Sequence, residues 1–284
     1  YEFAQFTNQT ESQRYLFLSD SLVTVDFESA FGLHKYGAFV QASHPFFDGR
    51  LTMSGGLRID GNEFNSAMSN PLRQASPRLS VRWSVAPKWS LNANLGRYFQ
   101  LPSYLVLGFV EDGQRINQAD AQYLRCDQAV LGVRYDWTER NTTLGLEGFS
   151  KAYGGGAISR SSGIALANLG ADFGVVGNEA VRFDGQGRAY GVEFLAQRKL
   201  YKGVYGLLAY TYVRSEYGVG GEYTASAWDS RHIVSMTGGA KLKRDWEIGV
   251  RWQYSGGLPY TPYDLEVSMD REYWDSQNVP QLDY

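Results

Sequence analysis

The sequence predicts an all-β fold, namely an antiparallel up-and-down transmembrane β-barrel. Apolar and polar residues alternate in segment after segment, the connections between segments alternate between short and long, and aromatic residues flank the apolar stretches. A bacterial barrel combines these features because its outer face contacts lipid, its lumen is wet, and its long loops lie on one rim.

Segment 246–255 shows the alternation most clearly. One face comprises Trp246, Ile248, Val250, Trp252 and Tyr254, and the other comprises Glu247, Gly249, Arg251, Gln253 and Ser255. A soluble antiparallel sheet with one wet face has the same period, so the prediction depends on its repetition along the chain. We expect the apolar face, with Leu79, Val81 and Val85 of an earlier segment, to contact lipid.

The same alternation predicts strands near 1–8, 36–45, 50–60, 78–86, 88–99, 123–137, 141–153, 188–200, 204–216, 230–243 and 246–256. Many are long enough to cross a membrane at a tilt, which takes about 9–11 residues. Two strands are irregular: 204–216 is apolar on both faces, and 141–153 changes phase between Leu146 and Phe149. A bulge or a covered lumen face would explain either.

The connections form two sets. Short turns are expected at 45–49, 86–88, 137–141, 201–203 and 243–245, and long loops at 9–35, 61–77, 100–122, 154–187, 217–229 and 257–284. Every second connection is long, which places the short turns on the periplasmic rim and the long loops on the extracellular rim. Long loops on a rigid scaffold are where recognition usually takes place.

Aromatic residues gather near both sets of connections. Those near the short turns are Phe46, Phe47, Trp89, Trp137, Tyr201 and Trp246, and those toward the long loops are Tyr98, Phe99, Tyr153, Tyr212, Tyr217, Tyr254 and Tyr260. Such residues form the aromatic girdles of membrane barrels. Cross-strand packing in a soluble β-sandwich is the alternative explanation.

Composition excludes other classes of protein. The chain has no apolar run long enough for a spanning helix. A net charge of −3 leaves no basic excess for nucleic acid. The single cysteine, Cys126, and the three dispersed histidines predict neither a disulfide framework nor a metal site, and no cofactor is expected.

Motifs in a consistent order resemble TonB-dependent outer-membrane receptors, specifically the Bacteroidetes type. They are Lys35–Ala42, Leu57–Asn62, Asn70–Leu72, Ser76–Ser80, Gly96–Pro102, Glu147–Tyr153, Gly187–Glu193, Ser226–His232 and Ser255–Tyr263. Each match is weak alone, but the ordered set covers nearly the whole chain.

The resemblance implies a barrel of about 22 strands, closed inside by an N-terminal plug domain and energised through the TonB protein. Residues 1–284 then form a single domain, the C-terminal half of that barrel with about 10–12 strands, without the plug or the final strands. The implied location is the bacterial outer membrane, and the expected partners are its lipid, the receptor's own plug, TonB and an imported nutrient. A surface lipoprotein is left open as a further partner.

Two groups of residues are candidates for function. Charges expected to face the plug from the barrel lumen are Arg58, Arg78, Arg82, Arg97, Glu147, Glu193, Glu247 and Arg251. Loop residues expected to bind the nutrient by stacking or by meeting anionic groups are Tyr104, Arg115, Arg160, Arg182, Tyr260, Tyr263, Tyr273 and Trp274. Iron chelate, cobalamin, glycan and peptide all remain open as ligands.

Three motifs suggest other chemistry without its full pattern. Asp229, Ser230 and His232 lie close in sequence, but no nucleophile elbow accompanies them, and we expect them to begin a strand and bond to neighbouring loops. The glycines 154–156 lack the residues of a phosphate loop, and the acidic run 264–275 does not match an EF-hand. We therefore expect no catalytic residues. A complete 12-stranded outer-membrane protease or lipase, or a soluble β-sandwich adhesin, remains the alternative.

Overall fold

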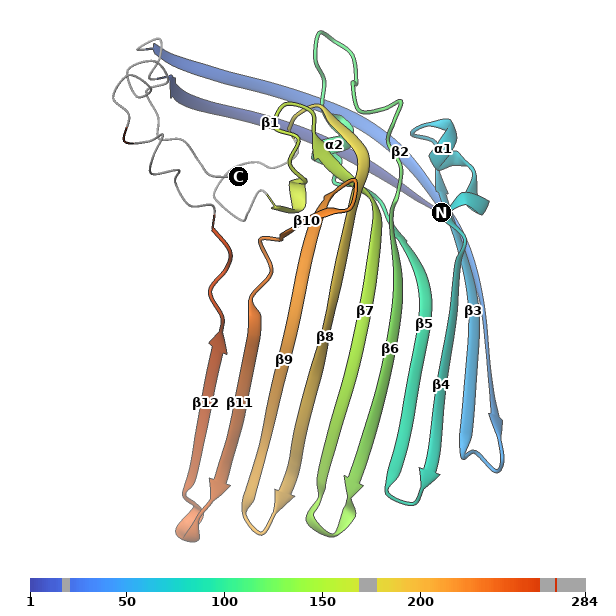
Figure 1. The fold of residues 1–284 in the computed structure, drawn as a ribbon, viewed down its shortest axis with the longest axis vertical. Coiled ribbons are helices and arrows are strands. Elements are labelled where there is room, and N and C mark those ends of the chain that lie inside the picture. Colours follow the sequence, from blue (N-terminus) through green and yellow to red (C-terminus); the bar gives the residue numbers. More distant parts are fainter. Residues whose placement is uncertain (17–20, 169–177, 261–268, 270–284) are drawn as a thin grey trace.

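The described part of the chain folds into one antiparallel sheet, in which neighbouring strands follow each other in sequence order (Figure 1). The structure is a computed structural model, and it describes residues 1–16, 21–168, 178–260 and 269. The sheet has 12 strands, and only the short β10 lies off the main path, paired with β9. This meander confirms the predicted fold class and excludes the β-sandwich, which needs two sheets packed face to face.

The strands are β1 (Glu2–Leu16), β2 (Ser21–Phe46), β3 (Leu51–Asn62), β4 (Ser76–Ala86), β5 (Trp89–Gln100), β6 (Leu124–Trp137), β7 (Thr142–Ser159), β8 (Val181–Tyr201), β9 (Val204–Val219), β10 (Glu222–Ala225), β11 (Arg231–Lys241) and β12 (Glu247–Ser255). The helical elements are α1 (Ser66–Ser69), η2 (Pro71–Gln74), α2 (Tyr104–Gly108), η3 (Thr138–Arg140), η4 (Leu166–Asn168) and η5 (Lys243–Asp245). Within the described ranges no helix has the length and apolarity needed to cross a membrane.

The five short turns that the sequence predicts all lie at one end of the sheet, at the bottom of Figure 1. The β8–β9 turn shows why they are tight. Tyr201 pairs with Val204 across Lys202 and Gly203, whose φ angles are 50° and 79°. Two left-handed residues make a turn whose twist matches that of the strands.

The register gives the sheet one apolar and one polar face, because residues directly opposite each other in an antiparallel pair share a face. One row of the apolar face comprises Met53, Val81, Ala93, Leu131, Gly148, Val192 and Tyr212. The matching row of the polar face comprises Thr52, Arg82, Asn92, Gly132, Glu147, Glu193 and Thr211. Leu131 is 66% exposed, as expected of a side chain that lipid covers in the membrane.

Residues 9–35 are not the long loop that the sequence predicts. β1 and β2 pair without interruption from Glu2 opposite Lys35 to Leu16 opposite Ser21, and in Figure 1 this hairpin runs above the tops of the other strands. The expectation failed for β1 because residues 9–14 are polar at every position, whereas in β2 the alternation of Val23, Val25 and Phe27 with polar residues was overlooked. A hairpin that projects beyond the membrane has no lipid face, so its strands need no alternation.

Two other expected loops are also shorter than predicted, because the strands beside them continue beyond the wall of the barrel. Within the expected loop 154–187, β7 continues to Ser159 and β8 begins at Val181, so residues 154–159 and 181–187 are strand. Within 217–229, β10 pairs with the end of β9. The register of β7 is regular at Leu146 and Phe149 and shifts at Gly154 and Gly156 instead. The irregularity therefore lies where the strand leaves the wall.

Replacing Val250 with Arg in the full-length protein should impair membrane assembly, because Val250 lies on the apolar face between Ile248 and Trp252. An arginine on the lipid face costs about 2–4 kcal/mol at the bilayer midplane. The matched control is Gln253→Arg on the polar face of the same strand. Heat-modifiable gel migration of outer-membrane fractions measures the folded barrel, and equal yields of the two variants would contradict the assignment of the faces.

Candidate functional site

Two carboxylates lie directly opposite each other on the polar face, where Glu147 of β7 pairs in register with Glu193 of β8. Asn92 Nδ2 donates to Glu147 Oε1 at 2.8 Å. Neither carboxylate has an ion-pair partner within the described ranges. Like charges directly opposite on a sheet repel each other, so this wall carries negative charge that its own described residues leave uncompensated.

Gly132 makes room for this pair. A Cβ at position 132 would lie 2.6 Å from Asn92 Oδ1 and 2.8 Å from Glu147 Cγ. Any larger residue would push both side chains away from the wall. The glycine thus leaves the space in which the Asn92 amide meets the Glu147 carboxylate.

The other predicted lumen residues have varied surroundings. Arg58 forms a two-pronged ion pair with Asp60, with both N–O distances 2.7 Å. The Arg78 guanidinium lies 4.6 Å from the centre of the Tyr98 ring, and Tyr205 donates to Glu247 at 2.8 Å. For Arg82 and Arg251 the described ranges hold no ion-pair partner. The register places these residues on the polar face. Their contact with a plug domain stays a prediction.

Arg97 is the exception. It lies opposite Asp127 in register and two residues from Leu95, on the apolar face of β5. The prediction that Arg97 faces the lumen is therefore wrong. The sequence reasoning assigned Arg97 by its charge, but the strand parity set by Leu91, Ala93 and Leu95 decides its side.

The long connections pack into a compact body, which we call the extracellular cap. Its core is apolar and comprises Phe31, Leu33, Phe64, Met68, Val106, Leu107, Ala121, Tyr123, Val181 and Phe183. These residues come from the β1–β2 hairpin, from the β3–β4 and β5–β6 connections, and from the first residues of β8. Most of the buried apolar side chains of the described chain belong to this cap. The two faces of the sheet are directed to lipid and to the lumen, so the strands of the wall enclose no core of their own.

Amide side chains connect the segments of the cap. Asn117 is fully buried; its Nδ2 donates to the carbonyls of Val106 and Glu179 at 2.8 and 2.9 Å, and its Oδ1 accepts from Val181 N at 2.8 Å. Asn65 Nδ2 likewise donates to the carbonyls of Gln118 and Ala121. A buried amide that satisfies several backbone groups fixes their relative positions.

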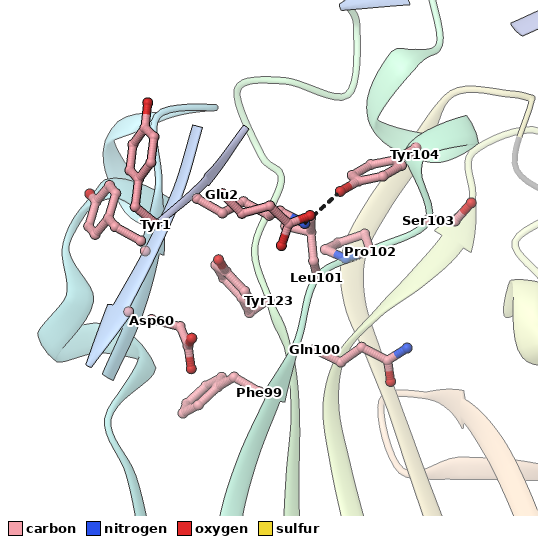
Figure 2. A pocket seen from close by; sticks show the side chains of 14 residues that line it. Tyr1, Glu2, Asp60, Phe99, Gln100, Leu101, Pro102, Ser103, Tyr104 and Tyr123 are labelled. Atoms are coloured by element: carbon pink, nitrogen blue, oxygen red, sulfur yellow. Dashed lines mark hydrogen bonds and ion pairs between the residues drawn. The ribbon is translucent and has the colours of Figure 1, made fainter. Parts of the chain in front are cut away.

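A pocket opens between the cap and the top of the sheet (Figure 2). Its volume is about 700 Å³, within the usual range for small-molecule sites. Its lining comprises Tyr1, Glu2, Lys35, Tyr36, Gly37, Asp60, Gly61, Phe99, Gln100, Leu101, Pro102, Ser103, Tyr104 and Tyr123. We call it the mouth pocket, because it lies at the long-loop end of the sheet.

Lys35 links the polar groups of the mouth pocket. Its Nζ lies 2.8 Å from Glu2 Oε1 and donates to the Tyr104 hydroxyl at 3.1 Å. Asn62 Nδ2 donates to the Tyr123 hydroxyl at 2.8 Å. Burial raises the pKa of Tyr123 above that of a free phenol, although the hydrogen bond with Asn62 opposes this shift. Tyr123 is therefore neutral at physiological pH.

Among the predicted ligand-binding residues that the structure describes, only Tyr104 lines the mouth pocket. Arg115 donates to the Ala30 carbonyl at 3.1 Å, Arg160 to the Val181 carbonyl and to Asp120, both at 3.0 Å, and Arg182 lies 2.9 Å from Asp184. Tyr260 is 85% exposed. Tyr263, Tyr273 and Trp274 lie outside the described residues.

The sequence reasoning missed Glu2, Lys35, Asn117 and Tyr123. Lys35 directly precedes the predicted strand 36–45, and Tyr123 is the first residue of the predicted strand 123–137. The sequence alone could therefore have placed both residues at the rim of the barrel. Only the fold of the cap brings them to one pocket. Asn117 carries no sequence signal that distinguishes it from a solvated loop amide.

The short run 228–232 is structural. The Asp229 carboxylate is fully buried and accepts from Ser215 N at 2.8 Å and from Arg214 Nε at 3.2 Å. His232 Nδ1 is hydrogen-bonded to the Tyr210 hydroxyl at 2.9 Å. The carboxylate and the imidazole thus have separate partners. Across the described ranges, no cluster of three or more His, Cys, Asp or Glu residues is placed to hold a metal ion.

A sequential antiparallel meander with one apolar face, short turns at one end and a folded cap at the other defines the class of outer-membrane β-barrels. The family model described as TonB dependent receptor-like, beta-barrel matches residues 2–279. The chain belongs to this family, and it is an outer-membrane protein. The narrower resemblance to the Bacteroidetes type stays a prediction.

Solved structures share the fold at low sequence identity. The ferric-catecholate import receptor Fiu of E. coli K12 is 11% identical, with a TM-score of 0.63 over 90% of this chain and 40% of that chain. The ferripyoverdine receptor of Pseudomonas aeruginosa is 13% identical, with a TM-score of 0.60 over 85% of this chain and 31% of that chain.

The FrpB iron transporter of Neisseria meningitidis is 15% identical, with a TM-score of 0.55 over 80% of this chain and 33% of that chain. This chain therefore spans between 31% and 40% of the length of these three proteins. No curated protein sequence matches the chain.

Replacing Asn117 with Leu should loosen the cap and leave the barrel folded. The change leaves one buried N–H and two buried carbonyls without their partner, at a cost of about 1–3 kcal/mol for each unsatisfied group. Limited proteolysis should then cleave within 101–123 faster than in the wild type. Gln114→Leu, at an exposed position of the same connection, is the control, and equal cleavage of the two variants would contradict the role of Asn117.

Proposed function

We propose that this chain forms part of the wall and the mouth of an energised importer, which binds a scarce nutrient outside the cell and passes it through the barrel when a plug domain moves. The observation that carries the proposal is the glutamate pair, Glu147 and Glu193, on the polar face. The chemistry is binding and gating, with no covalent step.

The charges of the polar face support a plug inside the barrel. In a barrel of this family the polar face surrounds the lumen. Glu147 and Glu193 repel each other across neighbouring strands, and Arg82 and Arg251 have no ion-pair partner in the described ranges. Cationic and anionic groups on a plug would compensate these charges. Such pairs can hold the plug and still release it, because the net energy of a wetted ion pair is small.

The mouth pocket supports capture of a small polar ligand. Lys35, Glu2 and Asp60 supply charges of both signs, and the phenols of Tyr104 and Tyr123 supply hydrogen bonds and faces for stacking. The three solved structures named above are described as an iron transporter, a ferric-catecholate import receptor and a ferripyoverdine receptor. A ferric chelate is therefore the first ligand to test, ahead of cobalamin, glycan and peptide.

Replacing both Glu147 and Glu193 with Gln in the full-length receptor should weaken the hold on the plug without unfolding the barrel, since the substitution relieves like-charge repulsion in the wall itself. Cells that carry the variant should become several-fold more sensitive to vancomycin, which is too large to cross an outer membrane whose barrels are closed.

Asp48→Asn is the matched control. Asp48 lies in the β2–β3 turn with a φ of 54°, a conformation that Asn tolerates well. Gel migration checks that each variant contains a folded barrel. Unchanged vancomycin sensitivity of the double glutamine variant, with the barrel folded, would overturn the proposed plug contact.

The import function itself is tested with a strain that lacks the receptor. We expect slower growth than in the parent when one nutrient limits growth, and we would compare ferric chelates, cobalamin, glycans and peptides in separate cultures. Tyr104→Ala should then reduce growth on the identified nutrient, while Tyr1→Ala at the outer edge of the pocket should have a smaller effect. Equal growth of the deletion strain and its parent on all four classes would contradict the proposal.

A further inference from the structure

Charged residues also lie on the outer, apolar face, in a row at its long-loop end. Arg97 of β5, Asp127 of β6, Ala152 of β7, Arg188 of β8 and Glu216 of β9 are successive partners across four strand pairs. The next row toward the short turns comprises Leu95, Ala129, Ser150, Tyr190 and Arg214. On β5 to β8 the charges therefore begin where the apolar face ends, at the level where lipid headgroups meet a barrel.

The arginines in this region are more exposed than the carboxylates that hold them. The side chains of Arg97 and Arg188 are 43% and 48% exposed, whereas those of Asp127 and Glu216 are 37% and 11% exposed. Asp127 binds Arg97 at 2.6 Å, and Glu216 binds Arg188 at 2.6 Å. The carboxylates thus fix the guanidinium groups in place, and the surface presents mainly positive charge.

Arg125 adds a third guanidinium with unused donors. It shares the outer face with Asp127, its side chain is 49% exposed, and its one ion pair within the described ranges is with Asp127 Oδ2 at 3.4 Å. Its guanidinium lies over Gly154 of β7, where a Cβ would be 3.4 Å from Arg125 Nη2. A half-exposed arginine with free N–H groups suits bidentate binding of a phosphate.

Small residues leave space between these arginines. On the outer face β7 carries only Ala152 and Gly154 here, so Arg97 and Arg125 on one side face Arg188 on the other across a strand without side-chain bulk. Two strand spacings separate β6 from β8, a distance of about 10 Å. Arg214 also binds Glu216, at 3.0 Å, and its other partner is the buried Asp229. Arg97, Arg125, Arg188 and Arg214 against Asp127, Glu216 and Asp229 leave one excess positive charge around this shelf.

We propose that Arg97, Arg125 and Arg188 form a binding site for the phosphate headgroup of an outer-leaflet glycolipid, whose acyl chains lie along the apolar face below. A soluble anion would fit the guanidinium groups equally well, but the adjoining apolar face with Leu95 and Leu131 favours a phosphate attached to a lipid. The site is distinct from the mouth pocket and does not depend on the imported nutrient.

The test measures lipid binding to the purified full-length receptor in detergent by native mass spectrometry, with lipid A that carries both phosphates and with the same lipid A after dephosphorylation. Wild-type receptor should bind the phosphorylated form at least tenfold more tightly. Arg125→Gln should lower that affinity about tenfold, as expected for the loss of one charge-assisted hydrogen-bonded contact. Arg244→Gln, in the turn at the opposite end, is the control and should leave binding unchanged.

A second variant keeps the proposal open to refutation if Arg125→Gln does not fold. Ala152→Leu fills the shelf without changing any charge and should also weaken binding of the phosphorylated lipid. Wild-type binding by either variant in a folded barrel would overturn the proposal, as would equal binding of the two lipids by the wild-type receptor. Displacement of the lipid by millimolar inorganic phosphate would show an anion site that does not recognise a lipid.

Discussion

Every backbone N–H and C=O group within the hydrocarbon layer has to find its partner inside the protein, and this constraint determines the rest of the structure. A strand satisfies it only through its neighbours, so the strands follow each other in sequence order and short turns connect them on one side. The same pairing fixes the register, and the register assigns each side chain to one of two faces. Arg82 and Leu131 are therefore placed by the backbone before any side-chain contact is made.

Outside the membrane this constraint ends, and packing takes over. The cap buries Leu33, Met68 and Leu107 completely, and Asn117 satisfies three backbone groups from two separate segments, one at Val106 and one at residues 179–181. The polar face shows the opposite arrangement, since Glu147 and Glu193 lie next to each other and neither forms an ion pair with another residue that the structure describes. The folded cap thus encloses a pocket between distant segments, and the wall places two carboxylates side by side.

The sequence predicted the wall well because lipid imposes a simple rule on it. Segment 246–255 alternates strictly, and β12 runs from Glu247 to Ser255 with the predicted faces. Arg97 was misassigned because a charge at the end of a lipid-facing strand lies in the headgroup region, where the rule no longer holds. The hairpin that replaces the expected loop 9–35 was missed because strands in water can be polar on both faces.

The sequence by itself determined the fold class, the end of the sheet that carries the long connections, and the face of nearly every residue within the wall. These follow from local periodicity, which a single strand displays. Only the tertiary structure decided that Lys35, Tyr104 and Tyr123 share a pocket, that Asn117 joins the cap, and that Arg97, Arg125 and Arg188 surround one shelf. Such groupings depend on contacts between distant segments, and the local alternation that the membrane imposes on each strand carries no information about those contacts.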